Sequence, residues 1–305
     1  MRNLTIQTAV LASLSFLAVD SFAAGFVTLP TSGTTAYVQC RTTGNFGSTT
    51  DSSFPAAPDD ACVAPNGVGV ALSITSSPET GFTLQSSNST AITAFSETLA
   101  TLNERVFRNS GAGQCIYAKQ VLMSNATTHD YNPDLAGVQK MEVNDYAFGG
   151  YTGAVSAAYA KQSAGFSSAF RIGRTFTSVQ MQADASVPAN VAAGYLVLPT
   201  AGGTSGTEIN GVGQTLTPPG SPTAAQQQAP FSSSWVDFTT DVTAGVDEDG
   251  TTNPSSPNMY IKQACANATV SVVANSFKIR QTGQETQPWV TVTASSRAPS
   301  STITP

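Results

Sequence analysis

The sequence predicts an all-β protein, a two-sheet β-sandwich that is jelly-roll-like and carries one long low-complexity surface loop. Short stretches rich in Val, Ile, Thr, Phe and Tyr recur between clusters of Gly, Pro, Ser and Asn, which is the pattern of strands separated by turns. Charged residues make up 10% of the 305 residues, against about 25% in a typical soluble domain. Ser, Thr, Asn and Gln must therefore supply most of the polar surface, and the length allows one large β domain.

The N-terminus has the layout of a secretory signal over residues 1–23. Arg2 supplies a positive charge, an apolar run of 11 residues follows from Ala9 to Val19, and small residues precede a mature start at Ala24. The run is too short to cross a bilayer, which takes about 20 residues; a buried N-terminal helix is the alternative. We therefore expect an exported protein, secreted or at the cell surface, with no membrane span in the mature chain.

Twelve strand-like segments can be placed in order along the chain. They cover residues 26–29, 37–41, 68–75, 116–123, 139–144, 155–161, 169–181, 195–198, 235–242, 259–264, 269–280 and 289–293. From Val270 to Phe277 the residues alternate in the manner of a strand with one buried face. This number and density of segments favour two packed sheets.

One further stretch allows two interpretations. Apolar residues at helical spacing run from Phe95 to Val106, as in an amphipathic helix. Residues 101–123 also read as a β-hairpin whose five-residue loop holds Gly111 and Gly113. We favour the hairpin, because the surrounding sequence is β.

Residues 200–234 differ in composition from the rest of the chain. They hold many glycines, four prolines and a Gln triplet, which is typical of flexible linkers and loops. The piece that follows has a single cysteine with no local partner. We therefore favour a surface loop within one domain over residues 24–298; an interdomain linker is the alternative. Residues 299–305 are expected to form a disordered tail.

Four cysteines remain after export: Cys40, Cys62, Cys115 and Cys265. An even number in an oxidising compartment indicates two disulfides, for which three connectivities exist. Closure of the shorter loop favours Cys40–Cys62, which leaves Cys115–Cys265. A zinc site is not expected, because no two cysteines are closely spaced and the single histidine, His129, has no cysteine nearby.

Catalytic candidates are few, and we predict no catalytic residue. His129 lies among turn-forming residues, and no G-x-S-x-G motif supplies a nucleophile. Glu142 and Asp145 point to opposite faces of an extended chain, so they cannot flank one glycosidic bond without a carboxylate from a distant strand. Turn chemistry instead predicts that Asn144 and Asp145 open a turn that runs to Gly149.

The acidic stretch 247–253 is the best candidate for a metal site. Asp247, Asp249 and Asn253 offer oxygen ligands around a glycine, as a calcium loop requires, with Asp241 near in sequence. The complete EF-hand pattern is absent, and a solvated acidic turn is the alternative. Calcium is the one cofactor that the sequence suggests.

The predicted mature N-terminus repeats an internal segment. AAGFVTLPT at residues 23–31 and AAGYLVLPT at residues 192–200 agree at six of nine positions. Coincidence is the alternative. If the match is functional, Phe26, Val27, Thr28 and Leu29 form an assembly strand that can add to an open sheet edge of a neighbouring subunit.

These features favour a secreted, non-enzymatic structural or adhesive cell-surface protein. Its most specific form is a filament subunit that assembles by β-strand addition, with copies of itself or other surface proteins as partners. With 13 Lys and Arg against 19 Asp and Glu, the chain lacks the basic footprint of a nucleic-acid-binding protein.

Two alternatives come from other classes. The first is a carbohydrate-binding module in which Trp235, Trp289 or tyrosines stack on sugar rings, although core packing is expected of both tryptophans. The second is a secreted hydrolase that uses acidic residues.

Overall fold

The computed structural model describes residues 25–33, 36–40, 54–55, 60–133, 135–176, 231–245, 253–281 and 290–304. Their regular structure is almost entirely β, with one short 3-10 helix, η1 (Pro65–Gly67). The strands are β1 (Val27–Thr28), β2 (Tyr37–Gln39), β3 (Thr83–Ala94), β4 (Glu97–Asn109), β5 (Gln114–Met123), β6 (Glu142–Gly149), β7 (Ser156–Ala160), β8 (Arg171–Gly173), β9 (Trp235–Thr243), β10 (Asn258–Ala264), β11 (Ser271–Gln281) and β12 (Val290–Ala298).

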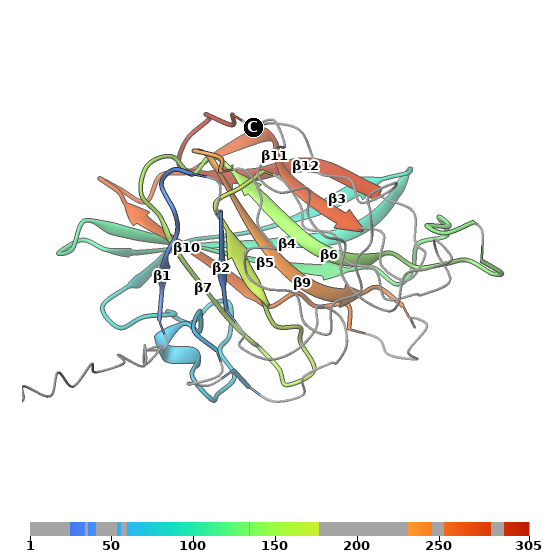
Figure 1. Ribbon diagram of the computed structural model, residues 1–305, viewed down its shortest axis with the longest axis horizontal. Helices are drawn as coiled ribbons and strands as arrows, with labels where there is room; N and C mark the ends of the chain where they lie inside the picture. Colours follow the sequence, from blue (N-terminus) through green and yellow to red (C-terminus); the bar gives the residue numbers. More distant parts are fainter. Residues whose placement is uncertain are drawn as a thin grey trace, which may run out of the picture.

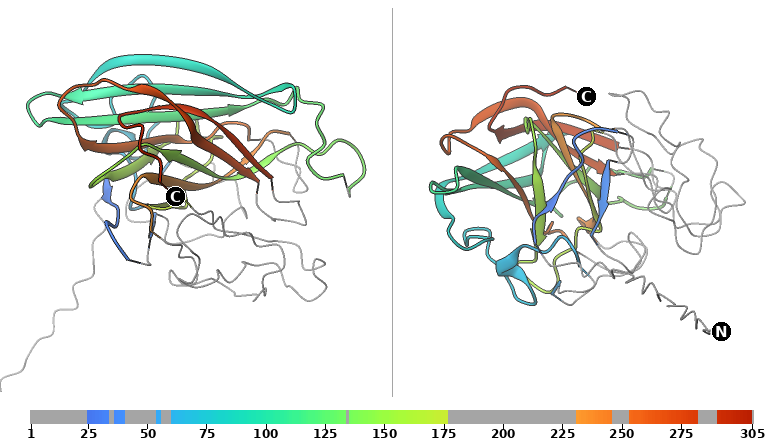
Figure 2. Two further views of the ribbon diagram at one scale, coloured as in Figure 1. Left: turned by 90° about the horizontal axis from the view of Figure 1, so that it is seen from above. Right: turned by 60° about the vertical axis from the view of Figure 1, so that its left-hand side comes forward.

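The strands form two six-stranded sheets that pack face to face (Figure 1, Figure 2). The first sheet has the order β1-β7-β10-β5-β4-β3, and the second has the order β12-β11-β6-β9-β8-β2. The facing sides bury a large apolar cluster that includes Leu102, Tyr117, Phe148 and Phe277. The prediction of an all-β two-sheet sandwich is therefore confirmed.

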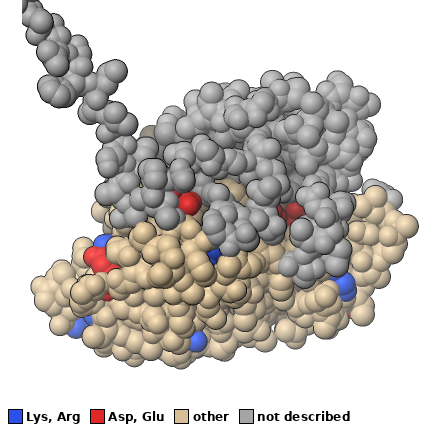
Figure 3. Space-filling view, turned by 90° about the horizontal axis from the view of Figure 1, so that it is seen from below, with Lys and Arg blue, Asp and Glu red and all other residues tan. Residues whose placement is uncertain are grey.

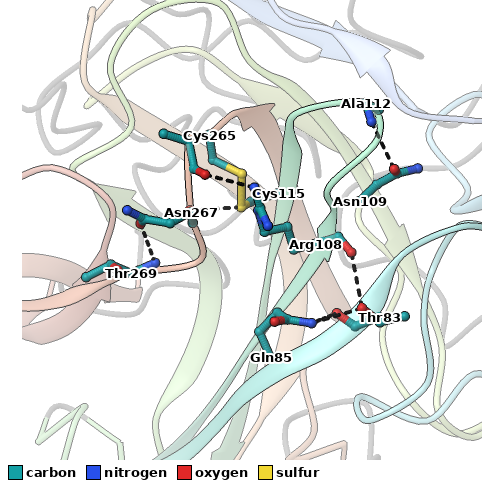
Figure 4. The surroundings of a disulfide bond; sticks show 10 residues. Thr83, Gln85, Arg108, Asn109, Ala112, Cys115, Cys265, Asn267 and Thr269 are labelled. Carbon is teal, nitrogen blue, oxygen red and sulfur yellow. Dashed lines mark hydrogen bonds between the residues drawn. A yellow bond between two sulfur atoms is a disulfide. The ribbon is translucent and has the colours of Figure 1, made fainter.

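The stretch with two interpretations is a β-hairpin. β4 and β5 pair antiparallel over their length, and the Asn109 side chain closes the turn by accepting a hydrogen bond from Ala112 N–H at 3.0 Å (Figure 4). Leu102 and Val106 are buried, whereas Asn103 between them is partly exposed. The helical spacing was misleading because these apolar residues also fit the two-residue period of a strand.

One strand assignment is wrong, and one strand was missed. Residues 68–75 run in turns and bends, and Leu72 and Ile74 join an apolar cluster with Phe107 and Tyr260 on the outer face of the first sheet. Conversely, β3 was not predicted, because its sequence TLQSSNSTAITA is mostly polar. Pairing with β4 makes it a strand.

The alternation predicted across residues 270–277 is interrupted by a bulge in β11. The register with β12 shifts between Val273 and Phe277, and Asn275 has φ +58°, a conformation that asparagine tolerates better than most residues. Val273 and Phe277 are buried, whereas Val272 is 61% exposed.

Both predicted disulfides are present. Cys40 at the end of β2 pairs with Cys62, and Cys115 on β5 pairs with Cys265, which follows β10 (Figure 4). A backbone hydrogen bond of 2.9 Å from Cys265 to Gly113 supports the second bridge. Two disulfides indicate maturation in an oxidising compartment.

The chain beyond β12 lies along the sandwich, whereas the sequence predicts a disordered tail over residues 299–305. Ser300 N–H donates to Gly150 O at 3.2 Å, and the Thr304 carbonyl accepts hydrogen bonds from the Ser232 and Ser234 hydroxyls at 3.0 and 2.7 Å. The predicted signal at residues 1–23 and most of the 200–234 loop lie outside the described residues. In the described part of the chain, no helix has the length and apolarity to cross a bilayer.

Removing the two disulfides separately is expected to have unequal effects on stability. In the chain-entropy treatment, Cys115→Ser/Cys265→Ser lowers the free energy of unfolding by about 5 kcal/mol and Cys40→Ser/Cys62→Ser by about 3 kcal/mol. The reason is that the bridged residues are 150 and 22 positions apart. Urea unfolding followed by tryptophan fluorescence measures both values, and equal losses would contradict the entropic explanation.

Candidate functional site

The predicted assembly strand, Phe26–Leu29, lies at one edge of the first sheet. Its β1 part pairs with β7, with Val27 opposite Ala157. Leu29 N–H continues the pairing by donating to Val155 O at 3.0 Å. In this chain the strand is thus paired with the chain's own sheet, through a small number of backbone contacts.

Two side chains anchor this strand, one on each face of the sheet. Leu29 is 1% exposed and belongs to the core between the sheets. Phe26 packs on the outer face, where its ring lies 6.4 Å from the Tyr260 ring and Lys262 Nζ lies 4.3 Å from the Phe26 ring centroid. The internal copy of the segment, residues 192–200, lies outside the described residues.

The predicted calcium ligands are described only in part. Asp247 and Asp249 lie outside the described residues, whereas Asn253 is 4% exposed and pairs with the Thr243 backbone in both directions. Its Nδ2 donates to Ser167 Oγ at 2.8 Å. Among the described residues, no three His, Cys, Asp or Glu side chains gather as a metal site would require.

His129 lies in a loop, as expected, but an aromatic stack covers part of its ring. The His129 ring stacks on Phe95 at 3.9 Å, and Tyr131 packs edge-on at 4.6 Å. Phe95 occupies the β3–β4 turn with φ +53°. The nearby Glu97 carboxylate accepts hydrogen bonds from Thr128, and the bond from the Thr128 hydroxyl lowers the pKa of Glu97. These contacts hold the loop that carries His129 against the β3–β4 hairpin.

The predicted turn at Asn144 and Asp145 is wrong, because both residues lie within β6. All eight residues of this strand are buried, so turn-forming composition was overridden by pairing with strands on both sides. β11 places Arg280 directly opposite Asp145, and β9 lies on the other side of β6.

A buried ion cluster lies on the second sheet, on the face directed away from the first sheet. Arg280 Nη1 donates to Asp145 Oδ1 at 2.7 Å and to Asp237 Oδ2 at 3.0 Å. The Tyr37 hydroxyl donates to Asp237 Oδ1 at 2.8 Å, and the Arg171 guanidinium lies 4.7 Å from the Tyr37 ring centroid. Three strands thus bring two carboxylates to one guanidinium.

Burial controls the protonation of this cluster. Burial and the adjacent Asp145 carboxylate raise the pKa of Asp237 well above its ordinary value, against the opposing charge of Arg280. Burial, together with the negative charge of Asp237, also raises the pKa of Tyr37. The side chains of Asp145, Asp237 and Arg280 are 0% exposed, which suits an ion cluster that holds strands in register.

Trp235, a candidate for sugar stacking, is 2% exposed and packs at 5.0 Å against Phe176. This burial confirms the expected packing role for Trp235. Trp289 lies outside the described residues. No described tryptophan therefore offers a ring face to a sugar.

Sequence reasoning missed Asp237 and Arg280 because their partners are distant in the chain. Asp145, Asp237 and Arg280 come from β6, β9 and β11, and strand pairing cannot be read from spacing. A signal was nevertheless present: Asp237 lies between Val236 and Phe238, and Arg280 follows Ile279, and a charge in a buried strand requires a partner.

Comparison with known proteins assigns no family to this chain. It matches no family model, no curated protein and no solved structure.

Replacing Arg280 is expected to be strongly destabilising. Arg280→Met removes the cation shared by the buried Asp145 and Asp237 side chains, and loss of one partner from a buried pair costs about 3–5 kcal/mol. Arg297→Met is the matched control, because Arg297 is 31% exposed and lies 3.8 Å from Glu104; about 1 kcal/mol or less is expected there. Urea unfolding gives both values, and similar losses would argue against the ion cluster as a stabilising element.

The raised pKa of Asp237 predicts a pH dependence of stability. The folded state holds a proton that the unfolded state has released, so the free energy of unfolding falls as the pH rises above 3.8, the ordinary value, and through the raised pKa. Asp237→Asn removes this contribution and is expected to flatten the decline. Urea unfolding of both proteins from about pH 4 to about pH 8 tests this; parallel profiles would contradict it.

Proposed function

We propose that this protein is a secreted, non-enzymatic structural or adhesive component of the cell surface, and that copies assemble by exchanging the N-terminal strand β1. The observation that carries the proposal is the position of β1. It is a short edge strand, held by Leu29 on one face and Phe26 on the other, at the end of the first sheet.

Exchange would preserve the contacts that hold β1 in place. A second copy offers the same β7 edge opposite Val27, the same core site for Leu29 and the same Tyr260 ring for Phe26. Because those contacts are equal within and between chains, exchange of an identical element is a low-cost route to assembly. Head-to-tail exchange that does not close on itself produces a filament.

The surface composition is compatible with close packing of copies. On the face seen in Figure 3, charged side chains are few and scattered among uncharged ones. Low charge density reduces the electrostatic repulsion that keeps many soluble proteins apart. The two disulfides support a role in an oxidising, extracellular setting.

Strand exchange is testable by trapping it. In Val27→Cys/Ala157→Cys, the two cysteines are cross-strand partners, which antiparallel geometry places within disulfide range. The protein starting at Ala24 is incubated at high concentration and then oxidised. A ladder of covalent multimers on non-reducing gels, and filaments by electron microscopy, are expected.

The control is Val38→Cys/Ile172→Cys, which joins the partners of β2 and β8 within one chain. It should migrate as a monomer on the same gel. Intramolecular bonds alone in Val27→Cys/Ala157→Cys, with a monodisperse monomer in solution, would overturn the proposal.

A further inference from the structure

We propose that β3 is a second self-association surface, at which the β3 strands of two copies pair antiparallel and continue the first sheet from one chain into the next. This contact goes beyond the exchange of β1, because β3 lies at the opposite end of the same sheet. The partner is a second copy of this chain.

The outer edge of β3 is available for backbone pairing. Among the described residues, β3 forms ladder pairs with β4, and no other strand pairs with it. The register is uninterrupted from Ser86 to Ile92, with irregularities confined to the two ends. The Arg105 guanidinium donates a hydrogen bond to one β3 carbonyl, that of Asn88. The long hairpin of β3 and β4 runs along one margin of the sandwich (Figure 2).

β3 lacks the features that usually block an exposed edge. Natural edge strands are protected by lysines, prolines, β-bulges or very short length; the two irregularities of β3, between Leu84 and Ser86 and between Ile92 and Thr93, lie outside its central stretch. β3 is 12 residues long, carries no charged residue and no proline, and is exposed or partly exposed everywhere except at Ile92. Two neutral copies can therefore approach without like-charge repulsion.

A ladder of neutral side chains leads to this edge. Ser89 Oγ donates to Asn103 Oδ1 at 2.7 Å, Asn103 Nδ2 donates to Gln120 Oε1 at 3.2 Å, and Gln120 Nε2 continues to Gln162. This row crosses β3, β4 and β5 and ends at Ser89. Cross-strand hydroxyl and amide pairs stabilise neighbouring strands, and an added β3 would extend the row with the same residue types.

Self-pairing is favoured over pairing with another protein because the strand is complementary to itself. An antiparallel two-fold arrangement sets Ser, Thr and Asn side chains against the same side chains of the second copy. An isologous contact of this kind uses one surface patch on both chains. It would join molecules laterally, whereas exchange of β1 joins them head to tail.

The experiment starts from the monomeric fraction of oxidised Val27→Cys/Ala157→Cys, in which an intramolecular bond prevents exchange of β1. Sedimentation velocity over a concentration series should show reversible dimers, and amide hydrogen exchange should slow across residues 86–92 as concentration rises. Ser87→Lys/Ser89→Lys, at two exposed positions, should raise the dimer dissociation constant by about tenfold or more, since opposed like charges are unfavourable.

The matched control adds the same charge elsewhere, with Val70→Lys/Val138→Lys at positions that are 50% and 52% exposed. It should leave the dissociation constant unchanged. Equal effects of the two lysine pairs, or a protein that stays monomeric at every concentration, would overturn the proposal for β3. Exchange of β1 is tested separately, with protein that lacks the intramolecular disulfide. Failure of the β3 proposal can therefore be distinguished from failure of strand exchange.

Discussion

The guanidinium of Arg280 is the contact on which the second sheet depends. β6 is buried along its whole length, so a charge on its outer face cannot be solvated by water and requires a partner from the protein. Arg280 supplies that partner to Asp145 and, in addition, to Asp237. A shift of one residue in β6, β9 or β11 would send its charged side chain to the apolar side of the sheet. The ion cluster therefore selects a single register for three adjacent strands.

The outer faces of the two sheets are buried in different ways. The first sheet covers part of its outer face with Leu72 and Ile74, from the segment that precedes β3, and leaves neutral strands at its two edges. The second sheet carries the cluster of Asp145, Asp237 and Arg280 on a buried outer face. This contrast explains why we assign association to the edges of the first sheet. The charged residues of the second sheet stabilise the fold, whereas the uncharged edges of the first sheet offer backbone groups and small polar side chains to a neighbour.

The elements predicted well are those whose signal is local. The β4–β5 hairpin follows from the glycines of its turn and from the β character of the surrounding sequence, and the pairing of Cys40 with Cys62 follows from their short separation. The errors arise where a distant segment decides the outcome. β3 is polar and becomes a strand by pairing with β4. Leu72 and Ile74 resemble part of a strand but pack as turns on the outer face of a sheet.

The sequence by itself determined the all-β class, the sandwich and the presence of two disulfides, because composition, two-residue periodicity and the number of cysteines can be read without knowing which strands are neighbours. The tertiary structure alone decided which strands are neighbours, and with them the cluster of Asp145, Asp237 and Arg280 and the exposure of the β3 edge. The physical reason is that strand pairing joins backbone groups that are far apart in sequence, and each pairing is chosen by the burial of side chains contributed by several strands at once.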